Sequence, residues 1–205
     1  MVLNKITQDV YWWRALEVER KRHLNGYIFV GPNGLTLVDP PGLPDAVIPE
    51  VTPLGKISSV IVTGRFQERR AQHFQRCYSA KLHAPAADQR LIVAKADNYF
   101  GPNDQLFGGF EVIALPHQRT PGESVLFHRQ SRAIVAGHLS GAPPGFISMR
   151  SEKLYHNFSA SFQAQLALLD LEFDIILPGL GTPVLTDGRK VLAGFLASYQ
   201  PAKMR

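Results

Sequence analysis

The sequence predicts an α+β protein with two sheets packed face to face and helices on both outer faces, a four-layer αββα sandwich. Short apolar runs bounded by turn residues recur in both halves of the chain, which is typical of antiparallel hairpins. Each half also contains helix-compatible segments, and helices outside two packed sheets would bury the apolar faces of both. The 205 residues are 45% hydrophobic and 19% charged, and we expect one domain over residues 1–205.

In the first part of the chain, residues 6–20 fit either a strand pair or a helix. Asn25-Gly26 predicts a turn before an apolar strand at residues 27–30. The sequence Gly31-Pro32-Asn33-Gly34 then predicts a hairpin turn, and residues 35–38 are the returning strand.

The stretch 57–74, ISSVIVTGRFQERRAQHF, is the centre of the functional prediction. Its apolar run ends at Thr63 and Gly64, and a helix-compatible run follows over residues 66–77. A buried strand that breaks at a glycine and continues into a helix places side chains at the carboxyl edge of a sheet. Ligands of open α/β sheets bind at this edge, so we expect the turn to form part of a site.

The rest of the chain predicts further strands and two more helices. Residues 85–108 are rich in loop-forming residues. The expected strands cover residues 81–83, 110–115, 124–127, 133–135 and 174–177, and the expected helices cover residues 162–171 and 189–199.

Charge and cysteine content limit the functional classes. The net charge of +5 comes from short basic clusters rather than a stripe interleaved with aromatic residues, so we do not expect nucleic-acid binding. No apolar run approaches the roughly 20 residues that cross a bilayer. The segment MVLNKITQDV has no signal-peptide core, and Cys77 is the single cysteine. We therefore expect a cytoplasmic protein without membrane contact.

Five segments, in this order, resemble the metallo-β-lactamase superfamily over nearly the whole chain. Residues 25–42 are similar to its opening hairpin and Asp-x-Gly turn, and residues 60–69 occupy the place of its Thr-His-x-His-x-Asp-His motif. Residues 115–122 are similar to its Pro-Gly-His-Thr-x-Gly loop. Residues 134–138 are similar to its strand ending in Gly-Asp, and residues 175–181 to its strand ending in Pro-Gly-His-Gly. The resemblance implies the αββα fold.

The resemblance also implies a dinuclear zinc or iron site, but this sequence departs from the family at the ligands. The family's ligand positions fall on Gly64, Phe66, Glu68, Arg69, Arg119, His138 and Leu180. An arginine cannot bind a metal, because its guanidinium is permanently protonated. Only Glu68 and His138 retain a donor, so we expect the usual site to be lost. Asp39 matches a residue that supports the metal loop through hydrogen bonds.

The leading hypothesis is a non-catalytic protein that binds a small anionic molecule. Guanidinium groups bind phosphate or carboxylate bidentately without a metal. The residues expected to bind the anion are Asp39, Arg65, Glu68, Arg69, Arg119, Thr120 and His138. In the alternative interpretation, the arginines form an internal salt-bridge network with Glu68, Asp39 and Glu123, and no ligand is needed.

Two functions from other classes stay open. One is a metal-dependent, metallo-β-lactamase-like hydrolase with a rearranged mononuclear site of Glu68, His117 and His138. Zinc, iron or manganese would be its cofactor, whereas the leading hypothesis needs none. The other is a structural partner subunit, for which a homodimer is one expected form.

Overall fold

In the computed structural model, which describes residues 2–18, 21–141 and 143–198, the strands form one twelve-stranded mixed sheet. Its main path is β7-β6-β5-β4-β3-β12-β11-β10-β9-β8, and β2 pairs with β1 and β3. The strands are β1 (Asn4–Lys5), β2 (Val10–Glu17), β3 (Arg22–Gly31), β4 (Gly34–Val38), β5 (Ile57–Ile61), β6 (Lys81–Pro85), β7 (Asn98–Phe100), β8 (Gln105–Leu106), β9 (Phe110–Ala114), β10 (Ser124–His128), β11 (Ala133–Gly141) and β12 (Ile175–Gly181). The α-helices are α1 (Ile48–Val51), α2 (Ala71–Tyr78), α3 (Phe158–Ala164) and α4 (Gly188–Ser198).

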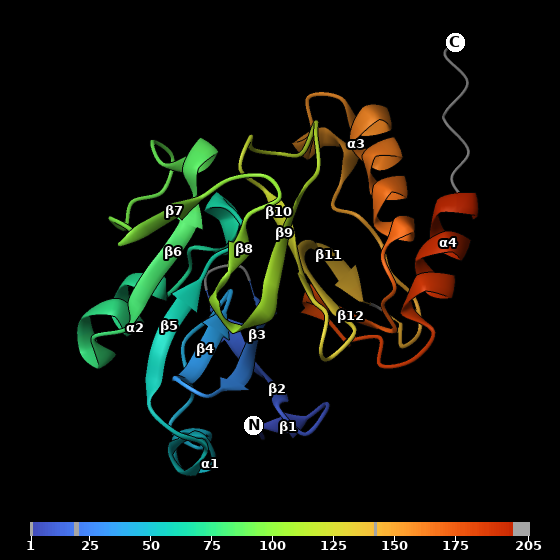
Figure 1. The fold of residues 1–205 in the computed structure, drawn as a ribbon. Coiled ribbons are helices and arrows are strands. Elements are labelled where there is room, and N and C mark those ends of the chain that lie inside the picture. Colours follow the sequence, from blue (N-terminus) through green and yellow to red (C-terminus); the bar gives the residue numbers. More distant parts are fainter. Residues whose placement is uncertain (1, 19–20, 142, 199–205) are drawn as a thin grey trace.

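The sheet curls into two facing layers around a central hydrophobic cluster. Side chains of β2–β5 meet those of β9–β12 there, and the rings of Phe29 and Phe110 lie edge to face with centroids 4.7 Å apart. A second cluster, which includes Phe74, lies beneath α1 and α2, and a third, which includes Phe162, lies beneath α3 and α4. Figure 1 shows the two helix pairs on opposite sides of the strands. The predicted αββα sandwich is confirmed.

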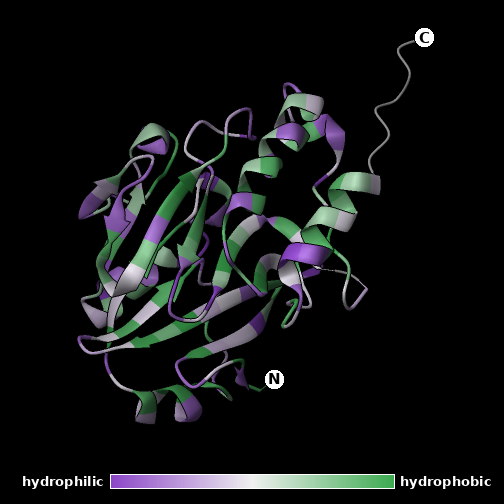
Figure 2. Ribbon diagram, turned by 45° about the vertical axis from the view of Figure 1, so that its right-hand side comes forward, coloured by the Kyte–Doolittle hydropathy of each residue, from purple (hydrophilic) through white to green (hydrophobic). Residues whose placement is uncertain are grey.

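Hydropathy follows these layers. The strands in the middle of the molecule carry most of the strongly hydrophobic residues, and the connecting loops carry many of the hydrophilic ones (Figure 2). Within the described ranges, no helix combines the length and the apolar character that a membrane span requires.

The two halves of the sheet join at β3 and β12, where Leu24 pairs with Leu180 in antiparallel register. Side chains reinforce this short seam. The Asn25 amide donates to the carbonyls of Pro178 and Gly181 at 2.9 and 2.8 Å, and the Tyr27 hydroxyl donates to Pro178 at 2.6 Å. The end of β12 therefore lies beside the start of β3.

Local predictions from the sequence are partly confirmed. The turn predicted at Asn25-Gly26 is wrong, because both residues lie inside β3 and pair with β2. The predicted hairpin is confirmed, since Gly31 pairs with Gly34. The ambiguous segment 6–20 contains a strand, β2, that pairs along all eight of its residues with β3; residues 19–20 lie outside the described part. Two strands inside the loop-rich segment 85–108, β7 and β8, are only three and two residues long, too short for a periodic signal.

The predicted helix boundaries are wrong at two places. Residues 66–70 do not belong to α2, because residues 65–67 form a separate 3₁₀ turn. The helix predicted at residues 162–171 begins earlier, since α3 begins at Phe158, and residues 165–170 continue it as a 3₁₀ helix. The predicted final helix 189–199 corresponds to α4, and residue 199 lies outside the described part.

One prediction tests the packing at the start of the seam. A Cβ atom at Gly26 would lie 2.5 Å from Trp13 Cζ2 and 2.6 Å from Pro41 Cδ, and both neighbours are rigid rings. We expect Gly26→Ala to lower the free energy of unfolding by about 2 kcal/mol through overpacking. Urea denaturation followed by tryptophan fluorescence measures this change.

Gly194 provides the matched control, because a Cβ atom there would meet nothing within 4 Å. Gly194→Ala, in the exposed middle of α4, should raise stability by about 0.5–1 kcal/mol through helix propensity. Equal stability of the Gly26→Ala variant and the wild type would contradict the packing argument.

Candidate functional site

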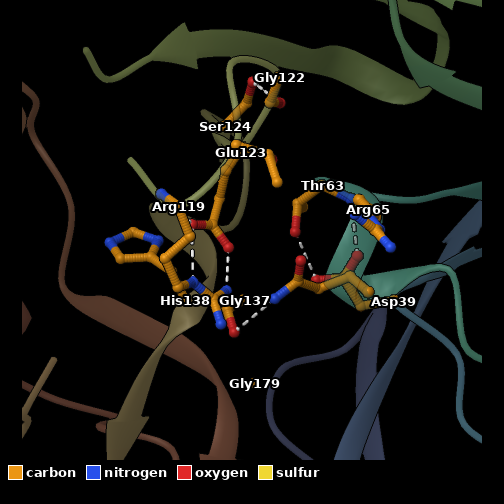
Figure 3. Close-up of polar contacts among 12 residues, drawn as sticks. Asp39, Thr63, Arg65, Arg119, Gly122, Glu123, Ser124, Gly137, His138 and Gly179 are labelled. Carbon is orange, nitrogen blue, oxygen red and sulfur yellow. Dashed lines mark hydrogen bonds and ion pairs between the residues drawn. The ribbon is translucent and has the colours of Figure 1, made fainter. Parts of the chain in front are cut away.

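The candidate site lies where the loops after β4 and β5 and the loop between β9 and β10 meet residues of β11 and β12. Figure 3 shows the polar residues that these loops bring together. Parallel pairing of β4 with β5 and of β11 with β12 places the carboxyl ends of these strands at one edge of each half. Ligand sites of α/β sheets occur at such edges, so the sequence motifs converge as expected from their positions.

Asp39 is buried at the end of β4 and fixes the loop after β5. Its carboxylate accepts hydrogen bonds from the backbone N–H and the hydroxyl of Thr63, both at 2.7 Å. Burial raises the pKa of Asp39 to about 6, although nearby Arg69 and the two bonds from Thr63 oppose this shift. Asp39 therefore acts as a buried support with a carboxyl group that is costly to ionise.

Arg69 connects the two halves of the sheet through backbone carbonyl groups. Its guanidinium donates to the carbonyls of Asn25 at 2.5 Å, Asp39 at 2.7 Å and Gly179 at 3.2 Å. These acceptors follow or belong to β3, β4 and β12. Arg69 itself has a φ of 41°, in the left-handed region that costs a non-glycine residue energy. Its Nε is buried and has no hydrogen-bond partner among the described residues.

Arg119 forms a buried ion pair with Glu123, four residues later in the loop between β9 and β10. Their side chains are 7% and 1% exposed. Arg119 Nε lies 3.0 Å from Glu123 Oε2, and Arg119 Nη2 contacts Oε1 as well. The guanidinium also lies over the ring of Phe66, 4.6 Å from its centroid. The pair and the ring therefore hold Arg119 in one orientation.

Gln67 fills the space between the loops, which the sequence did not indicate. Its amide donates to the Gly137 carbonyl at 2.9 Å, while Gln67 Oε1 is buried without a partner in the described part of the chain. Next to it, His138 Nε2 lies 3.0 Å from Gln165 Oε1 and Nδ1 is unpaired. Burial lowers the pKa of His138, which favours its neutral imidazole.

Besides Asp39, two of the predicted site residues support loops. The Thr120 hydroxyl donates to Asp88 at 2.7 Å, and the same carboxylate accepts from the N–H groups of Gly122 and Arg65. Glu68 accepts from the N–H groups of Val93 and Ala94 at 3.0 and 2.5 Å. The remaining two, Arg65 and the metal candidate His117, have exposed side chains.

Beside Arg69 and Arg119 lies a cavity of about 380 Å³, which we call the arginine cavity. Its lining comprises Glu17, Arg22, Leu24, Phe66, Gln67, Arg69, Arg119, Arg150 and Leu154. Two of its four arginines, Arg22 and Arg150, lie outside every motif of the sequence analysis. Arg22 lies 2.5 Å from Glu17, whereas Arg150 has no ion-pair partner among the described residues and a buried, unpaired Nε.

The arginine cavity is strongly cationic. Burial lowers the pKa of Arg150 to about 10, and repulsion from Arg119, Arg22 and Arg69 adds to the shift. The guanidinium remains protonated at neutral pH. The expected internal network is only partly present, since Arg119 pairs with Glu123 whereas Glu68 and Asp39 bind backbone and Thr63 groups.

Comparison with known proteins matches residues 3–199 to a family model described as metallo-beta-lactamase superfamily. Similar solved structures include VMB-1 (TM-score 0.76, 13% identity, 95% of this chain and 94% of that chain). Others are the DIM-1 metallo-beta-lactamase (0.70, 17%, 94% and 97%) and a metallo-beta-lactamase from Hirschia baltica (0.71, 16%, 95% and 95%). These identities show the fold alone. No curated protein sequence gives a significant match.

The fold implies a metal, but the residues present here do not fit one. Within the described ranges, no group of three or more His, Cys, Asp or Glu side chains is placed to hold a metal ion. Glu68 binds two backbone amides, His117 is exposed on another loop, and His138 is buried against Gln165. The guanidiniums of Arg69 and Arg119 occupy the same region, and fixed cations there disfavour a second cation.

The raised pKa of Asp39 predicts a pH dependence of stability. A carboxyl group that ionises near pH 6 in the folded state and near about 4 in the unfolded state stabilises the fold below pH 4. This contribution is lost as the pH rises through 6. We expect the wild type to lose about 2–3 kcal/mol relative to Asp39→Asn between pH 4 and pH 7, as measured by urea denaturation at each pH.

The difference in the free energy of unfolding between wild type and Asp39→Asn reports on Asp39 alone, because all other titrating groups are the same in both proteins. The asparagine keeps the shape of the neutral acid and can still bond Thr63. A constant difference across this pH range would show that Asp39 keeps an ordinary pKa.

Arg69→Lys tests the link between the sheet halves. An ammonium group keeps the charge but cannot span three carbonyls as the planar guanidinium does. We expect the free energy of unfolding to fall by about 2–3 kcal/mol, because buried carbonyls lose their donors. Arg70→Lys, at the neighbouring exposed position, is the control and should change stability by less than about 0.5 kcal/mol. Equal effects of the two substitutions would refute the role of Arg69.

Proposed function

The chain belongs to the metallo-β-lactamase superfamily, and we propose that it is a non-catalytic member with a lost metal site, whose arginine cavity binds a small anionic molecule. The observation that carries this proposal is Arg150. This guanidinium lines the cavity without a carboxylate partner in the described part of the chain, and its Nε is buried and unpaired. A buried donor without an acceptor costs free energy, and a bound anion would remove that cost.

The charges around the cavity support the same conclusion. Glu17 offsets Arg22, and Glu123 offsets Arg119. Arg69 donates to backbone carbonyl groups and lies near the carboxyl group of Asp39. Only Arg150 has no nearby acid within the described ranges, and its Nε is buried. The cavity therefore carries excess positive charge that an anionic ligand would neutralise. A guanidinium also offers the fork of donors that matches a carboxylate or a phosphate.

In this proposal the predicted site residues have different roles. Arg69 and Arg119 line the cavity and would contact the anion together with Arg22 and Arg150. Asp39, Glu68 and Thr120 hold the surrounding loops through the hydrogen bonds described above. Arg65 and His138 lie outside the lining, the first exposed and the second buried.

The other functions receive less support. A mononuclear hydrolase would need Glu68, His117 and His138 to leave their separate positions. The structural-subunit alternative and the homodimer stay predictions, which the molecular mass in solution tests. The cytoplasmic location also stays a prediction, and the exposed free thiol of Cys77 is compatible with a reducing compartment.

Phosphate binding to wild type and to Arg150→Gln tests the proposal. At constant ionic strength and about ten times the dissociation constant, phosphate should stabilise the wild type by about 1.4 kcal/mol. This corresponds to a rise in melting temperature of about 3–5 °C. Arg150→Gln should show a shift below about 1 °C, because the unpaired donor is removed.

Arg90→Gln is the matched control, because Arg90 is exposed and lies outside the cavity lining. It should retain the full shift. The comparison also removes the general stabilisation by kosmotropic anions, which acts equally on all three proteins. Equal shifts in all three, or no shift with phosphate, sulfate or nucleotides at millimolar concentration, would rule out the anion site.

A further inference from the structure

We propose, on the premise that the arginine cavity binds anions, that its ligand is an organic monoanion: a carboxylate with an aliphatic or aromatic body. The cavity joins a cationic wall to an apolar one. An inorganic anion would contact only the cationic wall. A nucleotide would bring more negative charge than the arginines of the cavity can neutralise.

The apolar wall consists of Phe66, Leu154 and Leu24, which line the same cavity as Arg150. Phe66 and Leu154 are 47% and 56% exposed. Large apolar side chains at the mouth of a cavity gain free energy when a ligand covers them. These side chains would contact the body of a ligand whose anionic group reaches the arginines.

Phe66 forms a fixed surface. The guanidinium of Arg119 lies 4.6 Å from its ring centroid, and that of Arg65 lies 5.7 Å from it. Arg119 is in turn held by its buried ion pair with Glu123. The ring is therefore placed before any ligand arrives, which lowers the entropic cost of binding against it.

The charge available favours a single negative charge on the ligand. Glu17 and Glu123 each offset one arginine, and Arg69 lies near the carboxyl group of Asp39. Only Arg150 is left without a nearby acid among the described residues. One carboxylate, bound bidentately, would satisfy this guanidinium.

The volume of the arginine cavity limits the size of its ligand. A volume of about 380 Å³ is in the range of small-molecule sites. A second cavity of about 510 Å³ shares Glu17, Leu24 and Arg69 with the first, and its lining includes the exposed apolar side chains of Leu16 and Val18. An extended chain could continue from one cavity into the other.

Calorimetric titration of the full chain with acetate, butanoate, hexanoate and octanoate tests this ligand class. We expect affinity to rise about threefold per added methylene up to hexanoate. Hexanamide, which lacks the charge, should bind at least tenfold more weakly than hexanoate, and ATP should bind more weakly than hexanoate.

Leu154→Ser should flatten this dependence on chain length, because it removes part of the apolar wall. Leu166→Ser, at an exposed leucine outside the cavity lining, is the control and should preserve the dependence. Phe66→Ala provides a second test of the apolar wall.

The outcomes separate this inference from the proposed function. Phosphate and acetate binding without any gain from a longer chain would overturn the organic-monoanion proposal and leave the anion site intact. Hexanamide binding as tightly as hexanoate would overturn it too. Failure of all anions to bind would overturn both proposals.

Discussion

The contact of Arg69 with three backbone carbonyls is the interaction on which the site depends. One guanidinium binds the chain at Asn25, Asp39 and Gly179, from β3, from the end of β4 and from β12. A metal joins loops by coordinating side chains, whereas this cation joins them by donating hydrogen bonds to the backbone. The planar fork of five donors makes this possible, because several acceptors can be bound in fixed directions. The loops of the two sheet halves can thus stay together without a metal.

Three acidic residues of the surrounding loops are used for the same purpose. Asp39 accepts two bonds from Thr63, Asp88 holds Gly122 and Thr120, and Glu68 accepts from two backbone amides. Carboxylates bound in this way fix loops, but they are not placed as ion-pair partners for the arginines of the cavity. The excess positive charge of the cavity is therefore a consequence of how the loops are held.

The sequence was sufficient for the fold and for the meeting of the motif segments in one region, but not for the residues that line the cavity there. Strand and turn signals such as Gly31 to Gly34 are local, and motif order locates the loops at one edge of the sheet. Arg22 and Arg150 could not be found in this way, because they are far apart in the sequence and only the folded chain brings them to one cavity. The inward position of Gln67 also depends on a 3₁₀ turn where the sequence pattern predicts helix.

Buried polar atoms without partners in the cavity lining indicate that the cavity has a functional role. Three residues of its lining, Gln67, Arg69 and Arg150, each have a buried polar atom without a hydrogen-bond partner. Native proteins satisfy most such atoms, because each costs about 1–3 kcal/mol. Burial first, and then the neighbouring arginines, disfavour the charged form of Arg150 and lower its pKa. An arrangement that only stabilised the fold would place an acid beside this arginine. The exposed apolar side chains at the same cavity are a second departure from what stability alone favours, and departures of both kinds concentrate at functional sites.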